Sequence, residues 1–329
     1  MVVNKNQTTA GKQTGFALLK NGNVVMGLVT IAAFVVLSVI IPQFLTVGNI
    51  FNLLVQASSI GIPAIGLTFI IITAGIDLSL PTTMAVSAIL GCAIMAKTQS
   101  TFLGVVSILA IAMFIGAING ISVSKLKMVP MIVTLAVSTV NIGISNYYTQ
   151  GKSVSGLPKS FSSVFAGSIG GVLPISVLVF ALVAVVMHIL LTKTIFGRQL
   201  FQTGVNEKAA RVNGVNTTKI IFLIYFIGGC MAGINGILTA ARLNSAGPTM
   251  GPQSAFNNIV CACVLGGASV WGGKGTILGT VFGSIVMALI TNVMNLMNID
   301  FFVTYVIKGL VIIAVCYLDV LRNRVKGSR

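Results

Sequence analysis

The 329 residues carry 20 Lys and Arg against 4 Asp and Glu, a formal net charge of +16, and 56% are hydrophobic while only 7% are charged. Since an average soluble domain has about 25% charged residues, this composition excludes a soluble globular protein. The basic residues lie in small groups between long apolar runs, not on one face with interleaved aromatic residues, which argues against nucleic acid as a partner and for an integral membrane protein.

The chain begins with a polar stretch, residues 1–23, that holds three lysines and no acid. The apolar run that follows is too long for a removable signal peptide. We therefore predict a cytoplasmic tail over 1–23, a transmembrane domain over 24–321 and a second cytoplasmic tail over 322–329.

Apolar runs bounded by Pro, Gly, Asn or charge predict an all-α membrane fold of about ten transmembrane helices, because helices satisfy their own backbone in lipid. The third and eighth runs are short. The runs are about 24–42, 53–73, 82–97, 102–123, 129–148, 172–192, 220–241, 255–271, 276–296 and 302–321.

Basic residues test this arrangement. With ten crossings, fifteen Lys and Arg fall on the side of the N-terminus and four on the other side, while Lys308 lies within the last helix. Cytoplasmic loops carry the excess of positive charge, so both termini are predicted to be cytoplasmic.

Two segments combine Gly or Pro with polar groups between apolar runs: Ala74–Pro81 (AGIDLSLP) and Gly266–Thr276 (GGASVWGGKGT). Transporters often break helices near the midplane, in corresponding positions of two repeats. Crossings 2 to 5 and 7 to 10 would then form an inverted repeat with a broken helix in each half.

Two ionisable residues are candidates for a translocation path. Asp77 is an acid beside the bundle core, where burial of a charge usually marks function; the alternative is structural, with Asp77 or Ser79 capping the next helix. Lys308 lies about 9 Å into its helix at 1.5 Å per residue, which allows either snorkelling to the outer surface or a buried role.

Two loops are long enough to contact a partner protein. The outward segment 149–171 is rich in Ser and Gly and is either solvated coil or a docking surface. The inward segment 193–219 predicts a short helix, with Asn206 as N-cap, Glu207 at its positive end and Gly214 as terminator. A helix of about seven residues is not stable alone, so it either rests on the bundle or docks into a cytosolic partner.

Three glycines at i, i+4 and i+8, namely Gly275, Gly279 and Gly283, predict a tight helix seam, within the bundle or between two subunits.

Catalytic chemistry is not expected. GGKGT lacks the earlier glycine of a phosphate loop, since Ala268 occupies that position. The one histidine, His188, has no acid nearby, and Cys261 and Cys263 form CxC without further ligands. We therefore expect no enzyme activity, no ATPase site of its own, no cofactor and no metal.

Taken in order, several motifs together resemble one family, the ribose-type permease subunits of bacterial binding-protein-dependent ABC importers. The resemblance covers about residues 50–321. The motifs are AGIDLS (74–79), NG (119–120), VPMIVTL (129–135), GVNEKAARVNGV (204–215), AARLNSAGPTMG (240–251), VLGGASVWGGKGTILGT (264–280) and VIKGLVIIAVCYLD (306–319).

The resemblance implies a permease dimer of identical or different subunits in the bacterial inner membrane, with membrane lipid around it. It also implies cytosolic ABC ATPase subunits and an extracytoplasmic solute-binding protein as partners. The short helix then corresponds to the coupling helix that sits in the ATPase. Its candidate coupling residues are Gly204, Asn206, Glu207, Ala209, Ala210, Arg211 and Gly214.

The expected function is import of a small polar solute, and the resemblance favours a monosaccharide such as ribose. Hexoses, autoinducer-like furanoses, nucleosides and branched-chain amino acids are alternative solutes. The family commonly has Glu-Leu-Asp where Phe256, Asn257 and Asn258 stand here, and Asn257 and Asn258 can hydrogen-bond a neutral solute. The path candidates are Asp77, Ser79, Asn119, Asn257, Asn258 and Lys308. The alternative is a stand-alone ion-coupled transporter that uses Asp77.

Overall fold

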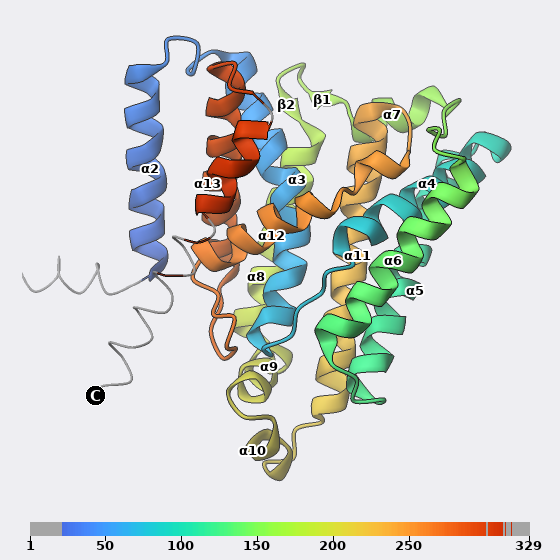
Figure 1. Ribbon diagram of the computed structural model, residues 1–329, viewed down its shortest axis with the longest axis vertical. Helices are drawn as coiled ribbons and strands as arrows, with labels where there is room; N and C mark the ends of the chain where they lie inside the picture. The colour runs from blue at the N-terminus through green and yellow to red at the C-terminus, as the bar shows by residue number, and fades with distance from the viewer. Residues whose placement is uncertain (1–21, 301, 312, 314–316, 318–329) are drawn as a thin grey trace, which may run out of the picture.

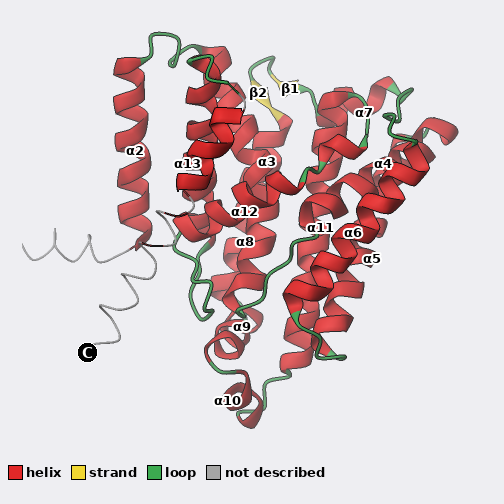
Figure 2. Ribbon diagram, viewed as in Figure 1, coloured by secondary structure: helices red, strands yellow, loops and turns green. Residues whose placement is uncertain are grey.

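The computed structural model describes residues 22–300, 302–311, 313 and 317, and over these residues the chain is a bundle of helices with one small hairpin (Figures 1 and 2). The predicted tails 1–23 and 322–329 lie almost wholly outside the described residues. The elements are α2 (Gly22–Ile40), α3 (Val47–Ile72), α4 (Leu80–Thr98), α5 (Thr101–Ser124), α6 (Pro130–Thr149), α7 (Lys159–Phe165), β1 (Ser168–Ile169), β2 (Leu173–Pro174), α8 (Ile175–Lys193), α9 (Ile195–Val205), α10 (Glu207–Val212), α11 (Thr217–Leu243), η1 (Pro248–Met250), α12 (Gln253–Leu265) and α13 (Ile277–Leu296).

Six of the described helices are long and apolar enough to cross a membrane: α3, α4, α5, α8, α11 and α13. Shorter apolar helices cover Met26–Ile40 and Phe302–Val311. The expected count of about ten spanning helices is therefore not confirmed, although each predicted apolar run overlaps a helix of the described residues.

The eighth predicted run, 255–271, is the clearest departure. Helix α12 has 13 residues and ends at Leu265. Its length of about 20 Å falls short of a bilayer core of about 30 Å. The helix stops because Gly266 caps it and Gly267 adopts a left-handed conformation with φ of 87°.

The centre of the bundle is formed by α3 and α11, which contact each other. Helix α3 is buried without interruption from Gly61 to Ile72. Helix α11 packs on α5, where a Cβ on Gly229 would overlap the carbonyl oxygen of Ala112, and α3 packs on α13. Glycine thus lets two backbones approach closely, as small residues do between membrane helices.

Three stretches without an α-helix interrupt this bundle. Residues 73–79 separate α3 from α4, with Ala74 in a left-handed conformation (φ 58°). Residues 266–276 separate α12 from α13 and bind the first stretch, because the Gly273 amide donates to the Ile72 carbonyl at 2.8 Å. The third stretch, 244–252, contains the short helix η1 and lies in the gap between the predicted runs 220–241 and 255–271; it returns to the start of α4, where a Cβ on Gly251 would overlap the Pro81 carbonyl.

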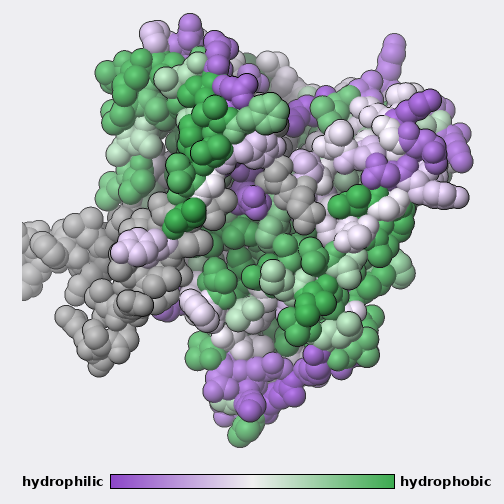
Figure 3. Space-filling view, in the orientation of Figure 1, coloured by the Kyte–Doolittle hydropathy of each residue, from purple (hydrophilic) through white to green (hydrophobic). Residues whose placement is uncertain are grey.

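The two ends of the bundle differ. Helices α9 and α10 form one end, at the bottom of Figure 1, whereas α7 and the hairpin of β1 and β2 lie at the other. In Figure 3 hydrophilic side chains gather over both ends and hydrophobic ones cover much of the side between them. The segment 149–171 is not solvated coil, because it contains α7 and β1 and buries Phe161 completely.

Candidate functional site

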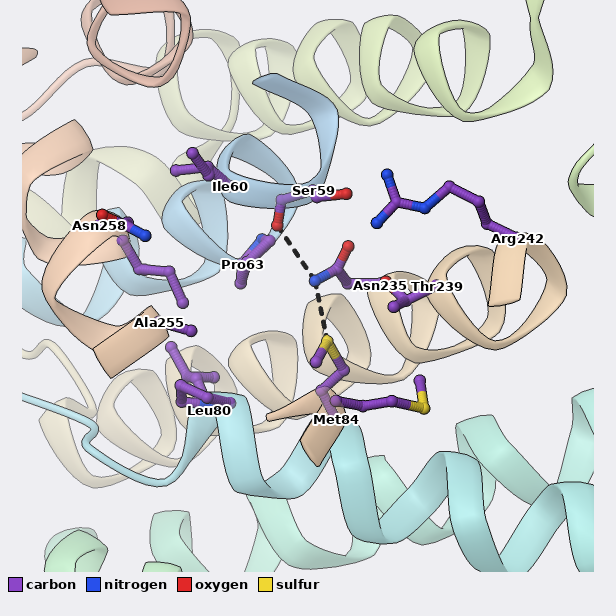
Figure 4. A pocket seen from close by; sticks show the side chains of 13 residues that line it. Ser59, Ile60, Pro63, Leu80, Met84, Asn235, Thr239, Arg242, Ala255 and Asn258 are labelled. Carbon is purple, nitrogen blue, oxygen red and sulfur yellow. Dashed lines mark hydrogen bonds between the residues drawn. The ribbon is translucent and has the colours of Figure 1, made fainter. Parts of the chain in front are cut away.

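A cavity of about 170 Å³ lies where the interrupted elements meet (Figure 4). Its walls come from α3, the start of α4, α11, η1 and α12. The lining residues are Ser59, Ile60, Pro63, Leu80, Pro81, Met84, Asn235, Thr239, Arg242, Met250, Ala255, Asn258 and Ile259. Pro63 within α3 and Pro81 in the first turn of α4 are both part of this wall.

Asn235 is the most buried polar side chain of this wall, with 5% of its surface exposed. Its amide nitrogen donates to the Ser59 carbonyl at 3.1 Å and lies 3.0 Å from the Met84 sulfur, and Figure 4 shows both contacts. Its carbonyl oxygen is buried and has no hydrogen-bond partner among the described residues. A neutral amide group at the wall of a cavity, with one hydrogen-bonding atom still unpaired, is typical of a site that binds a polar solute.

Two further spaces adjoin this cavity and share Ser59 and Arg242 with it. One, of about 210 Å³, also shares Ile60 and Asn258 and adds Gln56, Thr291, Asn295 and Lys308. The Gln56 carbonyl oxygen is a second buried acceptor without a partner in the described part of the chain. The other space is smaller and lies under the hairpin, lined by Phe165, Gly167 and Pro174 among others.

The predicted path candidates divide into separate places. Asn258 and Lys308 line the cavity and its neighbour. Asn257 is exposed and lines neither. Asp77, Ser79 and Asn119 lie together in a buried cluster that lines none of the three spaces, although Leu80 and Pro81, next in the chain, do.

In that cluster Asp77 is 1% exposed and accepts three hydrogen bonds. The Ser79 amide and hydroxyl donate to one carboxylate oxygen at 2.8 and 2.6 Å, and the Asn119 amide reaches the other at 3.4 Å. Asn119 also donates to the Ser79 hydroxyl at 2.8 Å. The carboxylate therefore fastens the turn that begins α4 to α5, which is the geometry expected of a structural acid.

At the far end, α10 carries most of the predicted coupling residues. The Asn206 side chain accepts from the Ala209 amide at 3.0 Å and caps the helix, while Ala210 is buried. Gly214 adopts φ of 81° and ends the turn, with Val215 donating to the Ala210 carbonyl at 3.0 Å. This is the left-handed termination that the sequence predicts.

Glu207 is paired within the chain. Its carboxylate lies 3.4 Å from the Lys127 ammonium in the loop between α5 and α6 and also binds Arg211, one helical turn ahead. Partial burial works to raise the pKa of Glu207, but the hydrogen bond from Arg211 and the positive charges of Lys127 and Arg211 outweigh it and hold the pKa below its usual range. At neutral pH the carboxylate is charged and ties α10 to α5 and α6.

The remaining predicted glycines lie in seams inside the bundle. A Cβ on Gly204 would overlap the Ile72 carbonyl oxygen, one on Gly279 that of Gly266, and one on Gly283 that of Ala262. Gly275 packs against the Ile72 side chain, where a Cβ would come within 2.8 Å. The seam of α13 thus faces α12 and α3 of the same chain.

Several functional candidates escaped the sequence reasoning. Gln56, Ser59 and Asn235 are polar residues within otherwise apolar helices, and that is the only signal they offered. Arg242 counted only as a basic residue of an outer loop. Val205 and Val212 end α9 and α10, and 75% and 87% of their surfaces are exposed. Apolar residues in a polar segment of the sequence could have indicated a contact surface for a partner. Within the described residues there is no group of three or more His, Cys, Asp or Glu that could hold a metal.

Comparisons with known proteins converge. Residues 49–316 match the family model described as branched-chain amino acid transport system / permease component. The chain is 36% identical to the ribose import permease protein RbsC of Bacillus subtilis (strain 168), over 87% of this chain and 88% of the relative. It is 32% identical to the L-arabinose transport system permease protein AraH of Escherichia coli (strain K12), over 90% and 89%, and 31% identical to the D-allose transport system permease protein AlsC of the same strain, over 96% of each. No solved structure matches the chain.

Proposed function

The chain belongs to the family of permease components of branched-chain amino acid transport systems, of the ribose type, and from that premise we propose that it is the membrane permease subunit of an ABC importer for a monosaccharide such as ribose. Its relatives include permeases for ribose, arabinose and allose, which are all neutral sugars. ATP is hydrolysed by a separate subunit, and this chain supplies the path.

The observation that carries the proposal is the cavity bounded by Asn235. Its unpaired carbonyl oxygen, the similar oxygen of Gln56 nearby, and the amide of Asn258 offer acceptors and donors without a carboxylate. Sugar hydroxyl groups both donate and accept hydrogen bonds, so they match the neutral amide groups that border these spaces. A strongly bound ion has no comparable ligand set here.

The cavity also lies where two repeated units meet. Helix α3 packs on α13 as α11 packs on α5, and α4 packs on α5 as α12 packs on α13. This pattern supports an inverted repeat of α3–α6 with α11, α12, α13 and the helix Phe302–Val311. A site between inverted repeats is the arrangement that alternating access requires.

Orientation follows from charge. The end that contains α9 and α10 carries Lys127, Lys193, Arg198, Lys208 and Arg211, and a basic end is cytoplasmic by the positive-inside rule. The tails 1–23 and 322–329 then lie in the cytoplasm, the permease domain covers 24–321, and the cavity opens toward the outside.

This orientation assigns partners to surfaces. The cytosolic ATPase subunits contact α10 and its exposed Val212, the solute-binding protein contacts the end with α7 and the hairpin, and lipid together with a second permease subunit, identical or different, covers the apolar sides. Closure of the ATPases moves α10 as a unit, because Glu207 ties it to Lys127.

The ion-coupled alternative finds no support in the cavity. Asp77 lines none of the three spaces, and its oxygens are occupied by Ser79 and Asn119. A carboxylate that binds a transported ion needs access to the path.

The test is reconstitution into vesicles with the ATPase and binding-protein partners. Uptake of labelled ribose should require ATP on the ATPase side and all partners. Asn235→Leu, which fills similar space without polar atoms, should reduce uptake at least about tenfold, since a sugar hydroxyl then loses its partner. Uptake by this chain alone, driven by an ion gradient, would refute the proposal.

A further inference from the structure

Two basic side chains lie on the walls of the path. Arg242, at the last turn of α11, borders all three adjoining spaces, and Figure 4 shows its guanidinium directed toward Ser59 across the cavity. Lys308, in the helix Phe302–Val311, is half-buried and lines the space of about 210 Å³ that Arg242 also lines. Residues 242 and 308 come from different halves of the chain but face one space.

No described acid balances them. Of the 4 acidic residues of the chain, Asp77, Glu207 and Asp300 are described, and none lines any of the three spaces. Asp77 is bound to Ser79 and Asn119, and Glu207 to Lys127 and Arg211 at the other end of the bundle. Asp300 is exposed and accepts from the Phe302 amide at 2.7 Å.

The other groups around these two cations are neutral. Gln56, Ser59, Asn258, Thr291 and Asn295 complete the wall of the space that both cations share. Neither Arg242 nor Lys308 forms a salt bridge with any residue that the structure describes. Within the part of the chain that the structure describes, nothing offsets the positive charges of exposed Arg242 and half-buried Lys308, and charges on partly buried side chains are screened less than charges in bulk water.

We propose that Arg242 and Lys308 form a charge filter in the outer part of the path, which repels positively charged solutes and admits neutral or anionic ones. The inference rests on the proposed function, since it treats this space as the solute's route. Positive charges on the wall raise the free energy of an entering cation, as basic residues do in other selective pores. A neutral sugar enters without this electrostatic cost, whereas a protonated amino sugar or an inorganic cation has to overcome it.

The local potential can be measured without transport, with thiol reagents of opposite charge. Ser59 lines all three spaces, and Ser59→Cys places a thiol there with little change of size. The full chain in vesicles is treated with anionic and with cationic methanethiosulfonate reagents of similar size, and the ratio of the two rates is recorded. Cys92, Cys261 and Cys263 are buried, and the rate of the chain without Ser59→Cys is subtracted.

We expect the anionic reagent to be favoured, and we expect the ratio to fall about tenfold or more when Arg242→Gln and Lys308→Gln are combined. Arg242→Lys and Lys308→Arg should keep the ratio, and added salt should lower it in the unmodified wall. A thiol at exposed Gln99, in the loop before α5, should give a ratio that the double variant leaves unchanged.

A ratio at Ser59→Cys that the double variant does not change would overturn the filter. ATP-driven ribose uptake is measured separately in the same vesicles. Uptake with a charge-independent ratio refutes the filter alone, while a charge-dependent ratio without any ATP-driven uptake refutes the proposed function and leaves only the positive potential of this space.

Discussion

Asp77 is a buried acid whose partners explain its presence. The Ser79 hydroxyl at 2.6 Å and the Asn119 amide hold it at the junction of α4 and α5, and the next residue, Leu78, donates from its amide to the Thr134 hydroxyl of α6 at 3.1 Å. These contacts fix the lead into α4, whose first residues line the cavity. The acid acts through position rather than through contact with the solute.

Asp77→Ala should therefore lower stability. The substitution leaves the Ser79 and Asn119 donors buried without an acceptor, which costs about 1–3 kcal/mol. The measurement is the thermal unfolding midpoint of the purified chain in detergent. The control is Asp300→Asn, because Asp300 is exposed and the asparagine oxygen can still accept from the Phe302 amide, so the midpoint should stay nearly unchanged. If Asp77→Asn abolished ion-driven uptake at an unchanged midpoint, the structural role would be wrong.

Glu207 gives a pH dependence with a definite sign. Partial burial raises the pKa of Glu207, but the Arg211 hydrogen bond and the Lys127 charge lower it by more, so the pKa of the folded chain lies below the ordinary value of 4.5. The contacts of Glu207 therefore stabilise α10 fully above pH 4.5, and this stabilisation is lost as the pH falls through the lower pKa of the folded chain. Amide hydrogen exchange of 210–213, corrected for intrinsic rates, should be constant from neutral pH down to about 5 and accelerate below 4.5.

Glu207→Gln removes the charge at every pH and should give the fast exchange already at neutral pH. A variant with unaltered exchange, or exchange that slows as pH falls, would contradict the assignment of Lys127 and Arg211 as its partners.

Only part of the site was predictable at the level of residues. Asp77 and Ser79 stood out because an acid and a serine shortly before Pro81 are conspicuous among apolar runs. Ser59 and Asn235 did not stand out, since scattered polar residues within a helix do not show what they contact, and only the crossing of α3 and α11 brings these two together. Sequence spacing within one helix carries no information about the partner across a helix crossing.

At the scale of elements, α10 presents an apolar residue for a partner. Val212 is 87% exposed at the end of a helix of 6 residues, although the segment around it is polar. Val212→Asp would place an unpaired carboxylate in the proposed contact with the ATPase. We expect ATPase affinity to fall at least about tenfold, measured by binding of the purified ATPase to the chain in detergent.

The control for this change is Val172→Asp. Val172 is 56% exposed in the turn between β1 and β2, at the opposite end of the bundle, so it should not affect ATPase binding. Equal loss with both variants would place the docking surface elsewhere or indicate general misfolding.

The seam behind α10 is the second element that we can test. Gly204 of α9 packs on the end of α3, where an added Cβ meets the Ile72 carbonyl, and the same carbonyl accepts from Gly273. Gly204→Ala should push these three segments apart, at a cost of about 1–3 kcal/mol, and should leave ATP hydrolysis without solute uptake. Gly143→Ala, at a helical glycine with no atom within 4 Å of the added Cβ, should do neither.

Prediction of the elements succeeded for the long apolar helices and for the short capped helix α10, and it failed at the C-terminal end of α12. The helices α3, α5 and α11 follow directly from their runs of apolar residues. The early end of α12 at Leu265 and the return of residues 244–252 to Pro81 depend on tertiary contacts. The sequence predicts a spanning helix over 255–271 because it does not show these contacts. Hydropathy reports transfer to lipid and does not distinguish a spanning helix from a buried half-helix.

The bundle has one strongly basic end, and the positive-inside rule predicts that this end is cytoplasmic. Helices α9 and α10 and the loop of Lys127 lie at the same end, because Glu207 binds Lys127 across them. The segment of Lys152 lies with the opposite end, since Val154 pairs with Ala246 just beyond α11. The two ends therefore have to face different compartments if the bundle crosses the membrane.

A single pair of variants tests this orientation. Lys208→Cys on α10 and Lys152→Cys near α7 both replace exposed lysines. In intact cells, stripped of their outer membrane where one exists, a membrane-impermeant maleimide should label Lys152→Cys and should label Lys208→Cys only after the membrane is opened. If position 208 reacted from outside and position 152 did not, the ATPase could not reach α10. The filter of Arg242 and Lys308 would then face the cytoplasm, and import through this chain by the proposed mechanism would be excluded.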